Sequence, residues 1–249
     1  MSSHTLAQEK AGLLSGSISS YRTWQINEGL SPIHGLELHP NFWCDIYFLP
    51  PNFLLSQLPV FDLLGSEYDG YLLFLNEPDL SSYGMHGQCE VTPRRGAELY
   101  VYTKAMLPLA KIVGPGISHV DYYNDFMWLT KWFNHVVSLT GGPPQMYAWD
   151  IHTYVQDGDP LAPVNALEQF LVSRGVTEPK FFISEWGSCN VGRLIEMKVA
   201  FDNDDRVLSH SIYEQSHAYW DGESRCILLF DESSSPLELT ELGEAFVNN

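Results

Sequence analysis

Basic residues are scarce in this sequence. Lysine and arginine together number 13 against 31 aspartates and glutamates, which gives a formal net charge of −18 at pH 7 over 249 residues. Nucleic acids and anionic membrane surfaces are held by clustered Lys and Arg, so we expect neither as a partner. A neutral polysaccharide or oligosaccharide is compatible with this charge, and so is the plainer explanation that the charge serves solubility.

Cysteine is also sparse, and no two of the four cysteines are spaced as a CxxC pair. A zinc site or a thioredoxin-type motif is therefore unsupported. One or two disulfide bridges remain open if the protein is exported. The residues concerned are Cys44, Cys89, Cys189 and Cys226. The nine histidines form no HExxH or HxH pair, and we expect no metal ion and no organic cofactor.

Long hydrophobic runs are missing as well. The first residues, MSSHTLAQEKAGLL, contain no apolar stretch of the length that a signal peptide needs, and no run approaches a membrane span. We expect a monomer that is cytoplasmic by default, or secreted if a signal has been removed. The length fits one large domain, residues 1–249, because α/β barrels of this size are usually undivided.

The segment Tyr71–Leu80, YLLFLNEPDL, organises the rest of the chain. It begins as a short apolar run and stops at Asn76-Glu77-Pro78, which is typical of a strand buried on both faces. Pro78 cannot donate to a sheet, so the strand must end there, and the proline is expected to hold Glu77 extended. An acid at the carboxyl end of a buried parallel strand lies where α/β barrels place their chemistry.

A second segment, Lys180–Ser188 with the sequence KFFISEWGS, follows the same pattern and ends on Glu185. Two buried strands thus each carry a glutamate at their end. Paired carboxylates are the machinery of glycoside hydrolysis, one as proton donor and one as nucleophile or base. The alternative is that both are ordinary surface carboxylates; the two motifs in this order favour the enzyme.

Strands that alternate with helices predict βα units and a parallel sheet, hence an α/β fold. The predicted strands are Ser19–Asn27, Gly35–Trp43, Tyr71–Glu77, Lys111–Ser118, Gln145–Tyr154, Lys180–Ser188, Ser209–Trp220 and Cys226–Phe230. The predicted helices are Phe53–Leu64, one that begins at Pro93 with Thr92 as N-cap, Tyr123–Leu139, Pro163–Val172, Asn190–Val207 and Thr240–Val247.

Together these motifs resemble the retaining glycoside hydrolases of the large (β/α)8 clan, and in particular glycoside hydrolase family 128, whose members cleave β-1,3-glucan. The resemblance spans roughly residues 21–188 and rests on the order Pro-Asn-Phe-Trp, LLFLNEPDL, a Thr-Pro helix ending in MLPL, KIVGPGIS, an aromatic helix, DIHTY and FFISEWGS. The segment LELTELGEAF near the C-terminus is similar to the closing helix of many clan enzymes.

The resemblance implies a (β/α)8 TIM barrel with the acid/base, Glu77, after strand four and the nucleophile, Glu185, after strand seven. Only two convincing strands precede Tyr71–Glu77, so the first strand is either the poor segment Leu13–Ser17 or missing. The implied activity is double-displacement hydrolysis of a β-linked polysaccharide, endo-β-1,3-glucan first. An acid in this role must keep its proton near neutral pH, which burial and a neighbouring carboxylate favour.

Further site residues are expected around the two glutamates. His152 and Tyr154 lie two apart on one strand and share a face with Asp150. The clan often has a His and a Tyr on this strand near the nucleophile, so the resemblance implies that Tyr154 donates to Glu185. The resemblance implies that Asn76 bonds the sugar 2-hydroxyl; a local turn bond is its alternative role. Candidates for stacking on or walling the sugar are Trp220 and Trp186, and more weakly Trp24, Asn41, Trp43 and Tyr83, for which a core or loop role is the alternative. For Trp186, packing is the favoured alternative.

Two alternatives to a β-1,3-glucanase stay open. The first is a sugar-binding barrel that does not turn over its ligand; the intact Asn76, Glu77 and Glu185 argue against it. The second is the same chemistry on another β-glycan, such as β-1,4-glucan, mannan or xylan.

Overall fold

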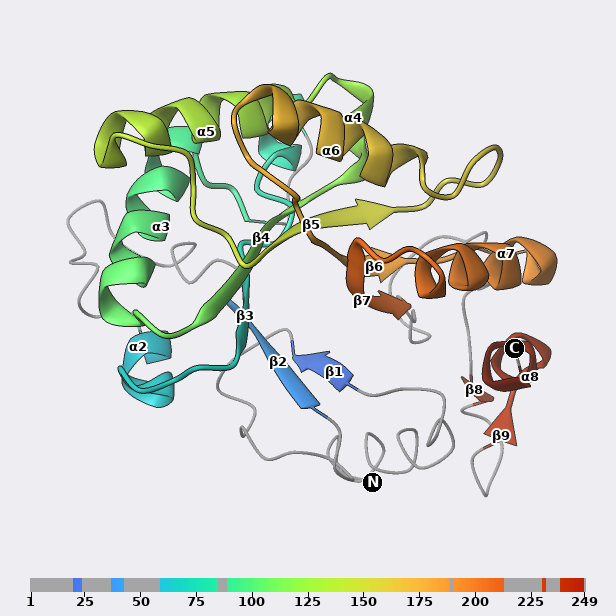
Figure 1. Cartoon of the computed structure of the whole chain (residues 1–249). Helices are drawn as coiled ribbons and strands as arrows, with labels where there is room; N and C mark the ends of the chain where they lie inside the picture. Colours follow the sequence, from blue (N-terminus) through green and yellow to red (C-terminus); the bar gives the residue numbers. More distant parts are fainter. Residues whose placement is uncertain are drawn as a thin grey trace.

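The fold is parallel α/β, with helices packed outside a curved sheet (Figure 1). The computed structural model describes residues 20–23, 37–42, 59–84, 89–188, 190–212, 230–231 and 238–248. Within them, seven strands form one sheet in chain order, and every neighbouring pair is parallel. This confirms the predicted parallel sheet of βα units.

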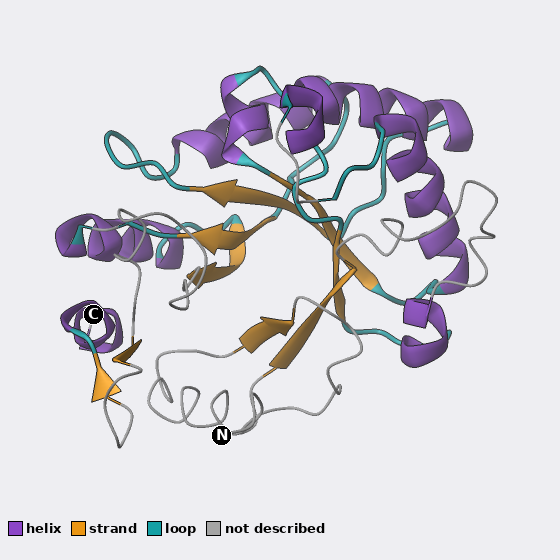
Figure 2. Ribbon diagram, turned by 180° about the vertical axis from the view of Figure 1, so that it is seen from behind, coloured by secondary structure: helices purple, strands orange, loops and turns teal. Residues whose placement is uncertain are grey.

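The strands of this sheet are β1 (Ser20–Thr23), β2 (Glu37–Phe42), β3 (Tyr71–Phe74), β4 (Lys111–Ile117), β5 (Ala148–Thr153), β6 (Phe181–Trp186) and β7 (Val207–Ile212). The helices are α2 (Pro59–Leu64), α3 (Pro93–Met106), α4 (His119–Tyr123), α5 (Met127–Thr140), α6 (Ala162–Ser173), α7 (Val191–Asp202) and α8 (Glu241–Asn248). A short antiparallel pair, β8 (Phe230–Asp231) and β9 (Glu238–Leu239), precedes α8 (Figure 2).

Most predicted elements are found close to their expected bounds, and two predicted helices are corrected. The predicted helix Tyr123–Leu139 is divided into α4 and α5, because Asp125 and Phe126 adopt left-handed φ angles of 54° and 53°. The predicted helix Asn190–Val207 ends at Asp202, and Val207 already belongs to β7. The segment Leu13–Ser17, the sequence beyond Ile212 up to Trp220, and the cysteines other than Cys89 lie outside the described residues.

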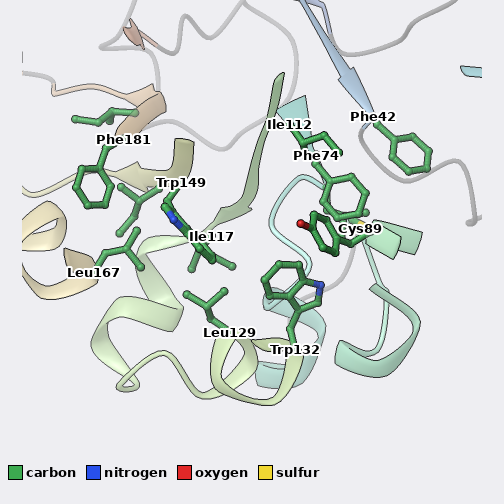
Figure 3. Packing of buried hydrophobic residues seen from close by; sticks show 14 of the residues in the cluster. Phe42, Phe74, Cys89, Ile112, Ile117, Leu129, Trp132, Trp149, Leu167 and Phe181 are labelled. Atoms are coloured by element: carbon green, nitrogen blue, oxygen red, sulfur yellow. The ribbon is translucent and has the colours of Figure 1, made fainter. Parts of the chain in front are cut away.

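The main hydrophobic core lies between the sheet and the surrounding helices (Figure 3). Side chains of Phe74, Ile112, Trp149 and Phe181 point from successive strands toward the helices, where Trp132 and its neighbours meet them. A second, smaller cluster of Leu73, Val113, Ala148 and Phe182 occupies the opposite face of the sheet. The alternation of the two clusters along β3, β4, β5 and β6 shows that this part of the sheet is buried on both faces, as the apolar runs predict.

The alternation fails at the end of β6, where the strand contains a bulge. Asp150 pairs with Phe182, but His152 pairs with Glu185, so one extra residue of β6 fits between the two pairs. Trp186 packs in the helix-side core together with Ile183, although an unbroken alternation would put them on opposite faces. The extra residue therefore changes which side chains face the inside of the sheet.

Two further structural facts bear on the predictions. Cys89, the one cysteine among the described residues, is disulfide-bonded, so the bridge left open by the sequence is present at this position. Its backbone N–H donates to the carbonyl of Asn76 at 3.1 Å, which ties the segment after the 3-10 turn Leu80–Tyr83 to the Asn-Glu-Pro loop. Among the described residues, no helix combines the length and apolarity needed to cross a membrane.

Candidate active site

Glu77 follows the carboxyl end of β3 and is held against β4 by the backbone. Its N–H donates to the carbonyl of Gly116 at 2.8 Å, and the N–H of Gly116 donates to the carbonyl of Leu75 at 2.9 Å. Leu75 and Glu77 have left-handed φ angles of 59° and 46°. The expectation that Pro78 keeps Glu77 extended is therefore wrong: the hydrogen bonds to β4 outweigh the local preference and hold a strained loop, as is common at functional sites.

Glu185 lies near the carboxyl end of β6, just beyond the bulge. Both glutamates are almost fully buried, with 8% of Glu77 and 5% of Glu185 exposed. Tyr154, which follows β5, donates its hydroxyl hydrogen bond to Oε2 of Glu185 at 3.0 Å. This is the contact that the sequence analysis predicts for Tyr154.

His152 of β5 contacts both glutamates through one ring nitrogen. Its Nδ1 lies 2.9 Å from Oε1 of Glu77 and 3.3 Å from Oε2 of Glu185. The ring is completely buried, which disfavours the charged form, but the negative charges of Glu185, Glu77 and Asp150 outweigh burial and raise the pKa of His152 to about 9. The acidic neighbours therefore favour a proton on this imidazole.

The other ring nitrogen of His152 faces Ser184. Nε2 lies 3.1 Å from the Ser184 hydroxyl, and that hydroxyl donates to Oδ2 of Asp150 at 2.6 Å. The backbone N–H of Ser184 donates to the second oxygen, Oδ1 of Asp150, at 3.0 Å. Asp150 thus accepts two hydrogen bonds from one serine and fixes the position of its hydroxyl.

The same arrangement occurs once more beside the Glu77 loop. Asp79 is fully buried and accepts from the backbone N–H of Ser118 at 3.0 Å and from its hydroxyl. Burial raises the pKa of Asp79 to about 7, with a smaller contribution from the charge of Asp121. Asp79 therefore connects the loop that carries Glu77 to the residue that follows β4.

Asp121 of α4 extends this polar network toward α5. It accepts from the hydroxyl of Tyr83 at 2.5 Å and from the backbone N–H groups of Trp128 and Leu129 at 3.0 and 3.2 Å. Burial raises the pKa of Asp121, and these hydrogen bonds counteract the rise. Asp121 caps the N-terminus of α5, a task that Phe126 at the cap position cannot perform. Tyr83, a weak candidate for the sugar cleft, is thereby tied to the network.

The structure brings together four of the predicted site residues and separates others. Asn76, Glu77, His152 and Glu185 are all buried around the same strand ends, with Tyr154 next to them. Trp186 is completely buried and packs against Phe201, His210 and Phe246, so packing and not sugar stacking is the role that the structure gives it. The weak cleft candidate Asn41 is buried at the end of β2. Trp24, Trp43 and Trp220 lie outside the described residues.

Sequence reasoning missed Ser184, Asp79 and Ser118. The bulge in β6 allows Ser184 and Glu185, which are adjacent in sequence, to approach the same histidine. No pattern in the sequence announces such a bulge. For Asp79 a signal existed, because it directly follows the Asn-Glu-Pro tripeptide and Ser118 closes the glycine-rich end of β4.

The imidazole of His152 and the carboxylates of Glu77 and Glu185 also form a set of donors that fits a metal ion. One nitrogen of His152 and one carboxylate oxygen each of Glu77 and Glu185 lie within 4.8 Å of one another. Imidazole and carboxylate together suit zinc and other divalent transition metals. A metal ion would compete with the proton on His152 for the same nitrogen.

Solved structures of similar fold include an endo-β-1,3-glucanase of GH128 subgroup II from Pseudomonas viridiflava, with 19% identity, a TM-score of 0.68 and coverage of 97% of this chain and 93% of that protein. A subgroup I endo-β-1,3-glucanase from Amycolatopsis mediterranei, in complex with laminaritriose, has 14% identity, a TM-score of 0.62 and coverage of 97% and 94%. A subgroup VII oligosaccharide-binding protein from Trichoderma gamsii has 16% identity, a TM-score of 0.66 and coverage of 97% and 90%.

Comparison with the curated proteins finds no match to this chain. Comparison with family descriptions does: the family called Glycosyl hydrolase catalytic core matches residues 5–233, which is most of the sequence. The match includes both strand ends with their glutamates and the β5 segment with His152 and Tyr154. The chain therefore belongs to the glycosyl hydrolase catalytic core family and is a glycoside hydrolase.

Proposed function

We propose that this protein hydrolyses β-1,3-glucan within the chain, by double displacement, with Glu77 as acid/base and Glu185 as nucleophile. The observation that carries the proposal is the approach of the two buried carboxylates: an oxygen of each lies within 4.8 Å of the other. Retaining glycosidases separate their carboxyls by about 5–5.5 Å, whereas inverting ones leave about 6.5–9.5 Å for a water molecule. The short gap supports direct attack by one carboxylate.

The choice of β-1,3-glucan is supported by the similar structures. Two of the three reported above are endo-β-1,3-glucanases, one of them holding laminaritriose. We also propose membership of family 128, a (β/α)8 barrel in one catalytic domain, and a sheet in which β3 and β6 correspond to barrel strands four and seven. The candidate first strand, Leu13–Ser17, lies outside the described residues.

In the first step, an oxygen of Glu185 attacks the anomeric carbon while the glycosidic bond to that carbon breaks. The departing oxygen takes a proton that Glu77 donates. In the second step, water attacks the same carbon, its proton passes to Glu77, and the Glu185 carboxylate leaves. Each step inverts the anomeric carbon, so the product keeps the β-configuration.

Neighbouring residues have roles in this scheme. The hydroxyl of Tyr154, which donates to Oε2 of Glu185 at 3.0 Å, holds the nucleophile in its orientation. Asn76 is proposed to bond the sugar 2-hydroxyl, a contact that strengthens in the transition state. Trp43 and Trp220 remain proposed stacking partners of the sugar.

The test is a hydrolysis screen with β-1,3-, β-1,4- and mixed-linked glucans, mannan and xylan. We expect cleavage of β-1,3-glucan into a series of oligosaccharides, and no cleavage by Glu185→Ala. If only another polymer is cleaved, the proposed substrate is wrong and the proposed chemistry stands. If only single terminal units are released, the enzyme acts from the chain end and the proposed endo action is wrong.

A second candidate function is oligosaccharide binding without turnover. It is favoured by one observation, the similarity to the oligosaccharide-binding protein of subgroup VII. Calorimetry with laminarihexaose, followed by product analysis of the same sample, distinguishes the two. Binding with an unchanged hexaose after long incubation would establish the second candidate.

A further inference from the structure

The chain after β3 stays attached to β4 beyond the end of the strand. The N–H of Gly116 donates to the carbonyl of Leu75 at 2.9 Å, and the N–H of Glu77 donates to the carbonyl of Gly116 at 2.8 Å. These two bonds alternate as in a ladder of parallel strands, and Asn76 forms a parallel bridge with Gly116 between them. The next donor is the N–H of Ser118, which in an unbroken ladder would pair with the carbonyl of Glu77.

The side chain of Asp79 accepts from this donor instead. Its Oδ1 accepts from the backbone N–H of Ser118 at 3.0 Å, and its Oδ2 accepts from the Ser118 hydroxyl. The carbonyl of Glu77 accepts from the N–H of Leu80 at 3.3 Å, where the 3-10 turn Leu80–Tyr83 begins. A carboxylate thus replaces a backbone carbonyl in the ladder, so the loop leaves the sheet after Glu77 without losing its attachment to β4.

The segment that Asp79 and Ser118 hold is strained. Leu75 and Glu77 have φ angles of 59° and 46°, in the left-handed region that residues with a side chain rarely adopt. A conformation of this kind persists only where the surrounding structure holds it. Asp79 and Ser118 are both completely buried, so solvent does not reach the two bonds between them.

The conformation held in this way places the Glu77 carboxylate in the active site. Its Oε1 lies 2.9 Å from Nδ1 of His152, and one of its oxygens lies within 4.8 Å of an oxygen of Glu185. A Cβ at Gly116 would lie 3.0 Å from the carbonyl oxygen of Leu75, so the loop lies as close to β4 as a glycine permits. Because a misplacement of about 1 Å can cost about 10²-fold in rate, this attachment bears directly on the chemistry of Glu77.

We propose that Asp79 and Ser118 are positioning residues for Glu77: by fixing the loop after β3 to the end of β4, they hold its carboxylate where it protonates the leaving oxygen. The proposal rests on the proposed function, because it takes Glu77 as the acid/base. Neither Asp79 nor Ser118 is assigned a contact with the substrate or a proton transfer; both act through the position of Glu77. A defect in either residue therefore resembles a partial loss of the acid.

The first test compares two substrates that differ in their need for an acid. Laminarihexaose releases a sugar hydroxyl, whose departure requires a proton, whereas a dinitrophenyl β-laminaribioside releases a phenolate that departs without one. Ser118→Ala removes the hydroxyl bond to Asp79 and keeps the backbone bond. We expect kcat/KM of this variant to fall about 10–100-fold on laminarihexaose and less than about threefold on the aryl glycoside. Equal losses on the two substrates would show a general structural role and overturn the proposal.

Asp79 offers both a disruptive and a conservative variant. Asp79→Ala removes both acceptors and should reproduce the substrate-dependent loss of Ser118→Ala. Asp79→Asn keeps an acceptor for the backbone N–H of Ser118, and the Ser118 hydroxyl can turn to accept from the new amide. We expect Asp79→Asn to restore much of the activity that Asp79→Ala loses on laminarihexaose. A loss as large as that of Asp79→Ala would contradict positioning by these hydrogen bonds.

A matched control lies at the opposite end of the sheet. The hydroxyl of Tyr100, a buried residue of α3, accepts from the backbone N–H of Gln145 at 2.7 Å, ahead of the start of β5. Tyr100→Phe therefore also removes a side-chain acceptor from a backbone N–H, but away from the strand ends that carry the glutamates. We expect the same kcat/KM as in the native protein on both substrates. A loss confined to laminarihexaose in this variant too would overturn the special role of Ser118.

The second test uses Glu77→Ala as the background. If Asp79 and Ser118 act only through Glu77, adding Ser118→Ala to Glu77→Ala should not lower kcat/KM on laminarihexaose any further. A further loss as large as the one that Ser118→Ala causes in the native protein would overturn the proposal. Native protein that cleaves no glycan would sink the proposed function and the positioning role with it. Native cleavage, with equal losses on both substrates in Ser118→Ala, would sink the positioning role alone.

Discussion

Oε2 of Glu185 accepts a hydrogen bond of 3.0 Å from the hydroxyl of Tyr154, which directly follows the neighbouring strand β5. The same oxygen lies 3.3 Å from Nδ1 of His152. The hydroxyl of Tyr154 and the imidazole of His152 thus converge on one carboxylate oxygen and hold it in place, as a nucleophile requires. Nδ1 of His152 also contacts Glu77, so one imidazole links the two carboxylates.

Replacing Tyr154 by Phe tests the bond to Glu185 directly. Loss of a hydrogen bond to a charged group costs about 1.5–3 kcal/mol, and we expect kcat/KM on β-1,3-glucan to fall about 10–100-fold. Tyr102→Phe is a matched control, because Tyr102 lies on α3 and packs against Phe61, away from the site. Steady-state kinetics at one pH suffice; equal losses in both variants would show that the bond has no special role.

The two glutamates are expected to respond differently to substitution. Glu77→Ala removes the proton donor, so substrates with good leaving groups should be affected least in the first step, and natural glucan should react about 10²–10⁴-fold more slowly. Glu185→Ala removes the attacking group and should affect all substrates alike. Added azide should partly rescue Glu77→Ala and give a β-glycosyl azide, which NMR identifies. An α-glycosyl azide from that variant would show that the two glutamates have the opposite roles or that the mechanism is inverting.

Two buried groups, Asp79 and His152, should contribute less to stability as the pH rises from about 4 to 9. The pKa of Asp79 is raised from 3.8 to about 7, so the folded state binds this proton more tightly and its contribution is lost between about pH 4 and 7. The pKa of His152 is raised from 6.5 to about 9, so its contribution is complete below pH 6.5 and is lost as the pH rises through 9. Each contribution is on the order of a few kcal/mol.

Urea unfolding at pH 4.5, 7 and 9 measures both contributions. In Asp79→Asn the decrease between pH 4.5 and 7 should become smaller, while the decrease between pH 7 and 9 stays. If the free energy of unfolding of Asp79→Asn falls between pH 4.5 and 7 as much as that of the native protein, Asp79 is not the group that titrates in this range.

Zinc ions should inhibit the enzyme by binding to the donors that form the site. Nδ1 of His152 and the oxygens of Glu77 and Glu185 lie within 4.8 Å of one another, and a metal ion there would block both carboxylates. Because zinc must displace the proton of His152, inhibition should weaken as the pH falls from 8 to 6. Magnesium, which prefers oxygen ligands and keeps its waters, should inhibit far less. A chelator should reverse the inhibition; activity that a chelator removes and a divalent ion restores would contradict the metal-free mechanism.

The sequence was sufficient for the elements that depend on local patterns. Apolar runs closed by proline or a polar residue identified β3 and β6, and with them Glu77 and Glu185. Spacing by two residues placed His152 and Tyr154 on one side of β5, and both now contact the glutamates. These predictions worked because strand burial and alternation are properties of short segments.

The sequence was not sufficient where long-range hydrogen bonds override local preferences. Glu77 departs from the extended conformation because its N–H pairs with Gly116 of another strand. Ser184 reaches His152 because β6 gains one residue relative to β5. The start of α5 depends on Asp121, which caps it from outside the helix. In each case the deciding partner is distant in sequence or belongs to a register that only the folded sheet defines.

The last prediction concerns the configuration of the first product. One oxygen of Glu77 and one of Glu185 lie within 4.8 Å of each other, which is closer than the separation of about 6.5–9.5 Å at which inverting enzymes hold their carboxyls. We therefore expect attack by Glu185 itself, followed by hydrolysis of the ester, so that two inversions return the β-anomer. Proton NMR of a β-1,3-glucan digest within the first minutes, before mutarotation, should show the β-anomeric signal first. An α-configured first product would rule out the covalent intermediate.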